Sequence, residues 1–76
     1  MWTTEFKHDE QGVSGMSHDF GNKVTVVTDL REKTIRRMHG DICVKEFTAD
    51  PEIGHYLRYL EEVDMEINSI QQSSNN

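Results

Sequence analysis

The sequence predicts an α+β domain in which a small antiparallel sheet of three to four strands precedes one long C-terminal helix. The first half contains short segments where apolar or β-branched residues alternate with polar ones, the pattern of half-buried strands. The last third has apolar residues at spacings of three and four, the repeat of one helix face. These residues are Ile53, Tyr56, Leu60, Val63, Ile67 and Ile70. We expect a single domain over residues 1–70.

The N-terminal strands are marked by a period of two. In residues 2–8, Trp2, Thr4 and Phe6 alternate with polar neighbours, which predicts a strand followed by a turn at 9–12. Residues 13–22 hold few apolar side chains, and a short irregular strand is favoured over an ordered loop. Residues 23–28, Lys-Val-Thr-Val-Val-Thr, have the strongest strand propensity in the chain.

Residues 29–40 admit two interpretations. Asp29 and Glu32 have the spacing of a capping box and Gly40 suits a helix end, so a helix over 30–39 is one prediction. The other is a hairpin that turns near 31–33, with a strand at 34–38 and a second turn at 39–40. The hairpin is favoured because the helix would have a poor apolar face, and the helix stays open as an alternative.

Residues 41–48 are predicted to form a central strand because apolar residues occur on both of its faces. Ile42 and Val44 would lie on one face, and Cys43 and Phe47 on the other. Cys43 is the only cysteine, so it excludes an intrachain disulfide, and its position predicts a small buried hydrophobe and no nucleophile. No catalytic residue is assigned, and the chain is not expected to be an enzyme.

The start of the helix is marked by Asp50 as a cap, Pro51 at the first helical position and Glu52 at the positive end of the helix dipole. The helix should run to about residue 70. Residues 71–76 are polar throughout, so a disordered tail is predicted there.

The apolar stripe of this helix predicts self-association. From residue 53 to residue 70 it would extend ~27 Å at 1.5 Å per residue, whereas a strand of six residues spans only ~20 Å. The helix should therefore extend past its own sheet, and exposed apolar surface there favours contact with another copy. The predicted oligomer interface consists of Tyr56, Leu60, Val63, Ile67 and Ile70. The alternative is that the stripe packs only on the chain's own sheet.

Charge is unevenly distributed along this acidic chain, whose net charge is −6. Residues 30–45 carry five basic and two acidic side chains, and the remainder carries three basic and twelve acidic ones. Arginine suits phosphate and carboxylate groups, so this stretch is the predicted site for an anionic ligand or an acidic partner surface. Its candidate residues are Arg31, Lys33, Arg36 and Arg37. A simple solvated surface is the alternative, and the acidic remainder disfavours direct nucleic-acid binding.

The remaining motifs predict no metal, no cofactor and no membrane contact. His8-Asp9 and His18-Asp19 pair potential ligands, but adjacent residues of a strand point to opposite faces and cannot easily serve one ion. No apolar run approaches the ~20 residues that span a bilayer. A single cysteine and the lack of a basic and then apolar leader predict a cytoplasmic protein.

Together these features predict a small acidic, non-catalytic binding protein that self-associates through its C-terminal helix. It would act by occupying another macromolecule, such as a host or cellular protein, as an inhibitor or regulator of the kind that phages encode. Two alternatives stay open. One is an oligomeric binder of an anionic small ligand such as a nucleotide, through residues 31–37. The other is a metal-dependent hydrolase that uses the His/Asp pairs.

Overall fold

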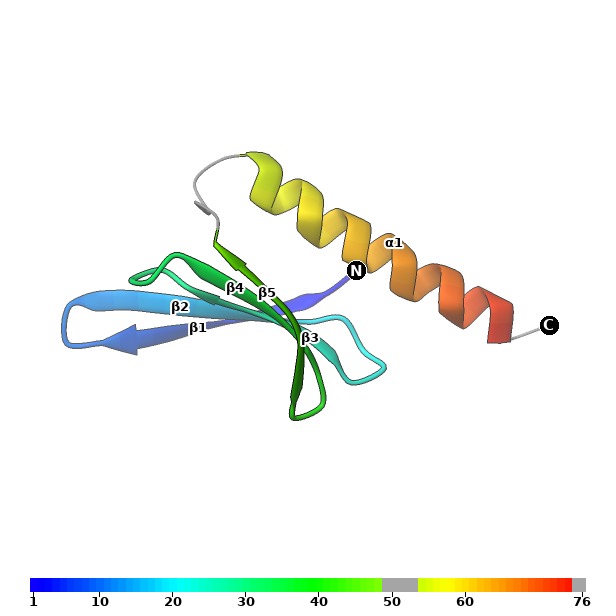
Figure 1. Cartoon of the computed structure of the whole chain (residues 1–76), viewed down its shortest axis with the longest axis horizontal. Coiled ribbons are helices and arrows are strands. Elements are labelled where there is room, and N and C mark those ends of the chain that lie inside the picture. Colours follow the sequence, from blue (N-terminus) through cyan, green and yellow to red (C-terminus); the bar gives the residue numbers. More distant parts are fainter. Residues whose placement is uncertain (49–53, 75–76) are drawn as a thin grey trace.

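In a computed structural model of the chain, one antiparallel sheet is covered on one face by a single helix (Figure 1). The structure describes residues 1–48 and 54–74. The elements are β1 (Thr3–Asp9), β2 (Gly12–Asp19), β3 (Val24–Asp29), β4 (Thr34–His39), β5 (Ile42–Thr48) and α1 (Gly54–Ser74). Strand order in the sheet follows the sequence, so each strand pairs with the next one along the chain.

The predicted α+β class is confirmed, but the sheet has five strands and not three to four. Both uncertain segments are strands. Residues 12–19 form strand β2, whose pairing with β1 is irregular at Ser14, and residues 29–40 form the hairpin, with β4 pairing to β3 in a continuous register from Val24–His39 to Asp29–Thr34. The helical alternative for residues 30–39 was wrong because this pairing satisfies the backbone of the segment.

The prediction of a central position for residues 41–48 was also wrong, because β5 is an edge strand. Ile42 and Val44 are largely exposed, and Cys43 is an exposed free thiol. The pairing register shifts next to Val44, between Arg37–Lys45 and Met38–Cys43, so this edge carries a β-bulge. Bulges and charged side chains are common devices that keep sheet edges from pairing with other chains.

The helix extends further than its predicted end, through the first four residues of the expected polar tail to Ser74. Each residue added to an existing helix gains a backbone hydrogen bond, so polar residues can continue it. The predicted start signals Asp50, Pro51 and Glu52, and the apolar Ile53, lie outside the described residues, as do Asn75 and Asn76. No helix in the described part of the chain is long and apolar enough to cross a membrane.

The core lies between α1 and the face of the sheet that it covers. Its buried members come from β3, β4, α1 and the β2–β3 connection, and Trp2, Met16, Phe47 and Tyr59 pack around them. They are Phe20, Val24, Val26, Ile35, Tyr56, Leu60, Val63 and Ile67. Burying each such side chain contributes roughly 1.5–3 kcal/mol, so this single layer of contacts supplies most of the apolar stabilisation.

Candidate functional site

Most of the predicted oligomer interface belongs to the intramolecular core. Tyr56, Leu60, Val63 and Ile67 are each less than a tenth exposed because the chain's own sheet covers them. Of the five predicted residues, only Ile70 is exposed, at 52%. The spacing therefore located the buried face of α1 correctly, but the structure places that face against the sheet of the same molecule.

The C-terminal end of α1 extends past the β2–β3 connection (Figure 1), although Ile67 in its second half is still buried. Ile70 lies near the C-terminal end of α1. Leu57 and Met65 are also exposed, and neither belongs to the predicted oligomer interface. Among the described side chains of α1, the large apolar ones that are exposed are therefore separate from the buried face.

The basic stretch does not converge on one site. Arg31 lies in the β3–β4 turn and forms an ion pair of 3.0 Å with Asp9, while Arg37 forms one of 2.8 Å with Glu66 on α1. Arg36 pairs with Glu46 of the neighbouring strand. Lys33 occupies the same turn as Arg31, with a positive φ of 58°.

These ion pairs leave little free positive charge for a ligand. The Arg37 guanidinium holds the pKa of the Glu66 carboxyl below its usual value through their hydrogen bond. The pKa of Asp9 is lowered first by the backbone amide of Gln11 and then by Arg31. Three of the four predicted anion-binding residues thus already contact a carboxylate of the same chain.

A largely buried polar cluster, which was not predicted from the sequence, joins α1 to three strands. His18 of β2 is 4% exposed. Its Nδ1 is hydrogen-bonded to the Thr4 hydroxyl at 2.9 Å, and its Nε2 is hydrogen-bonded to the Tyr56 hydroxyl. The Tyr56 hydroxyl is also 2.8 Å from the hydroxyl of Thr28 in β3. We call Thr4, His18, Thr28 and Tyr56 the helix–sheet cluster.

Hydroxyl groups can satisfy a neutral imidazole at both nitrogens. With the ring proton on Nδ1, this nitrogen donates to Thr4 and the Tyr56 hydroxyl donates to Nε2; with the proton on Nε2, the two directions reverse. Burial lowers the pKa of His18 below its ordinary value of 6.5 and raises the pKa of Tyr56 above 10.0. Both groups are therefore neutral at pH 7, and the cluster holds the helix in register on the sheet.

Replacing Tyr56 by Phe should lower the free energy of unfolding by about 1–3 kcal/mol, because two buried partners lose a hydrogen bond. Urea unfolding followed by circular dichroism measures this change. Tyr59→Phe is the matched control. The buried Tyr59 hydroxyl lies near Arg37 but has no hydrogen-bond partner among the described residues, so its removal should cost little. Equal losses in the two variants would contradict a special role for the Tyr56 hydroxyl.

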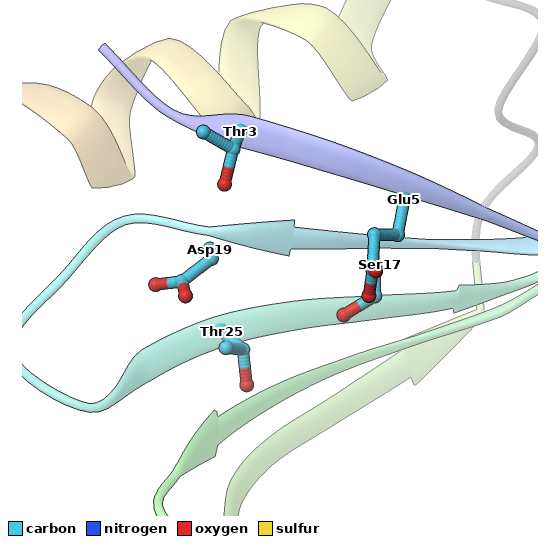
Figure 2. Close-up of a pocket in the computed structure, with 5 residues that line it drawn as sticks. All are labelled: Thr3, Glu5, Ser17, Asp19 and Thr25. Carbon is cyan, nitrogen blue, oxygen red and sulfur yellow. The ribbon is translucent and has the colours of Figure 1, made fainter.

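The face of the sheet opposite α1 carries a polar hollow of about 500 Å³. It is lined by Thr3, Glu5, Ser17, Asp19 and Thr25, whose side chains point away from the helix (Figure 2). Strand pairing brings them together, because Asp19 lies between Thr3 and Thr25 in one cross-strand row and Glu5 faces Ser17 in the next. We call these five residues the open-face hollow.

The hollow offers hydrogen-bond acceptors and negative charge. Neither Glu5 nor Asp19 forms an ion pair within residues 1–48 and 54–74. Asp19 accepts a hydrogen bond of 2.9 Å from the Gly21 amide, which fixes its carboxylate at the end of β2. The sequence carried a signal for this site, because the outward positions of β1 and β2 are polar, but recognising it required the strand order and register.

The His/Asp pairs are separated as the alternation of a strand predicts. His18 points into the core, whereas Asp19 lines the hollow on the opposite face. His8 is exposed, and its neighbour Asp9 is engaged by Gln11 and Arg31. Among the described residues, no group of three His, Cys, Asp or Glu side chains is placed to hold a metal ion.

No family model, curated protein or solved structure matches this chain.

Proposed function

We propose that this chain is a small non-catalytic binding protein that acts by occupying a basic surface of another protein, with the open-face hollow as its contact site. The observation that carries the proposal is the pair of exposed carboxylates Glu5 and Asp19, unpaired within the described residues, in a hollow otherwise lined by hydroxyl groups. Arginine and lysine are the side chains that such acceptors bind, and complementary charge increases the rate and specificity of association.

The geometry favours this surface over the two predicted from the sequence. Four of the five predicted interface residues of α1 lie in the core, and each arginine of the basic stretch is paired with a carboxylate. On the open face, by contrast, β1 to β3 present negative charge over half-buried Ser17 and Thr25. A guanidinium group that entered the hollow would gain ion pairs without first displacing an internal partner.

The test begins with affinity capture on the immobilised chain to identify a bound protein, followed by calorimetric measurement of its Kd. Neutralising both carboxylates in a Glu5→Gln/Asp19→Asn variant should cost about 2 kcal/mol, or roughly thirtyfold in Kd. Glu61→Gln/Glu62→Gln is the matched control, because it removes the same charge from exposed positions of α1. We expect this control to change Kd by less than about threefold, as exposed charges contribute little.

Two outcomes would count against the proposal. One is a captured partner whose contact surface lacks basic residues. The other is an equal loss of affinity in both variants, which would show that total charge matters and that the hollow does not.

A further inference from the structure

The helix–sheet cluster places a buried imidazole, His18, at the interface that closes the core. The His18 ring contacts hydroxyl groups of β1 and α1, and the Tyr56 hydroxyl extends the cluster to β3. The rings of His18 and Tyr56 are tilted by 56° with centroids 5.8 Å apart. A proton added to His18 would therefore place a full positive charge among neutral groups under the helix.

The charged groups on this side of the sheet do not balance the positive charge that such a proton would add. Strand pairing places Thr4, His18, Val26, Arg37 and Lys45 in one cross-strand row, so the charged members of that row are cations. The acidic side chains that α1 directs toward the sheet are engaged elsewhere: Asp64 pairs with the amino terminus of Met1, and Glu66 pairs with Arg37. Tyr56, the titratable group that touches the ring, is neutral.

We propose that the helix–sheet cluster is an acid-sensitive latch: opening of α1 from the sheet takes up a proton at His18, so acidification exposes the apolar seam of the helix. The seam consists of Tyr56, Leu60, Val63 and Ile67, whose exposure would allow contact with a second copy or another apolar surface. This inference concerns regulation of the fold and does not depend on the proposed binding function.

The direction of the effect follows from proton linkage. In the closed form, burial keeps the pKa of His18 below 6.5, whereas in the open form the ring meets water and recovers its ordinary pKa. Above pH 6.5 the His18 ring is neutral in both forms, and the latch contributes its full stability. As the pH falls below 6.5, only the open form binds the proton, so the opening constant rises by up to about tenfold per pH unit. This rise ends when the pH reaches the lowered pKa of the closed form.

The experiment measures hydrogen exchange of the α1 amides between pH 7 and pH 5, corrected for the intrinsic exchange rate. We expect the opening constant of the natural chain to rise by up to about tenfold per pH unit below pH 6.5. His18→Gln keeps a hydrogen-bonding side chain that does not titrate, so this rise should be lost. His8→Gln is the matched control, because His8 is exposed on β1 and should leave the pH dependence unchanged.

A second measurement keeps the test decisive if the His18→Gln chain does not fold. An NMR titration of the natural chain should show that the His18 ring of the folded form is still mostly neutral at pH 6.5, because burial lowers its pKa. A His18 ring that is at least half protonated at pH 6.5 in the folded state would overturn the proposal. An identical pH dependence of opening in the natural chain and in folded His18→Gln would overturn it as well.

Discussion

Replacing Leu60 by Ala is expected to lower the free energy of unfolding by about 2–5 kcal/mol, the range measured when large aliphatic side chains are removed from packed cores. Leu60 is 1% exposed and lies in the middle of the buried face of α1. The change leaves a cavity against the sheet, and small domains have only about 5–15 kcal/mol of stability in total. Urea unfolding followed by circular dichroism would show a large fall in midpoint.

Leu57→Ala is the matched control for this prediction, since it makes the same change one turn away on the same helix. Leu57 is 58% exposed, so its truncation should alter the free energy of unfolding by less than about 1 kcal/mol. Comparable losses in the two variants would mean that α1 is not docked as described. A concentration-dependent loss confined to Leu57→Ala would instead reveal self-association through the outer face of the helix.

Gly15→Ala should destabilise the fold by about 1–3 kcal/mol, because a methyl group has no room at this position. An added Cβ would lie 2.6 Å from the carbonyl oxygen of Thr28, which is backbone and cannot rotate away. Gly15 pairs with Asp29, and the carbonyl of the preceding Ser14, where the β1–β2 register shifts, accepts a hydrogen bond of 2.9 Å from the Leu30 amide. The substitution should therefore separate β2 from β3 at this point.

The same unfolding measurement on Ser17→Ala provides the comparison for Gly15. Ser17 lies two residues along β2 on the same face, where its side chain is only half-buried. Its loss should change stability by no more than about 0.5 kcal/mol. If Gly15→Ala proved equally harmless, the Thr28 carbonyl could not lie as close to Gly15 as described.

The hairpin at residues 29–40 shows why local sequence could not settle the fold. Asp29 accepts hydrogen bonds of 2.8 and 3.0 Å from the amides of Arg31 and Glu32, the bonds that an N-cap residue also makes. One local motif is thus compatible with a turn or a helix start. The strand form is stabilised by β3 and β5, which pair with β4 on both sides. The local sequence pattern does not indicate such pairing with other segments.

The candidate sites were predictable to different degrees. The spacing of Leu60, Val63 and Ile67 identified the apolar face of the helix, but it could not show how much of that face the sheet covers. The bulge in β5 and its position at the edge explain why apolar residues on both faces did not indicate burial there. The helix–sheet cluster and the open-face hollow both depend on side chains from three or more elements, so they required the register of the whole sheet.

The strand order has a consequence for synthesis on the ribosome. Because each strand pairs with the preceding one, hairpins can form successively as the chain emerges, and short-range pairing of this kind favours rapid folding. The helix that covers the apolar side of those hairpins follows all five strands in the sequence, so it is translated after them. The nascent chain therefore exposes an apolar layer until the helix has left the exit tunnel, and a chaperone could bind that layer during this interval.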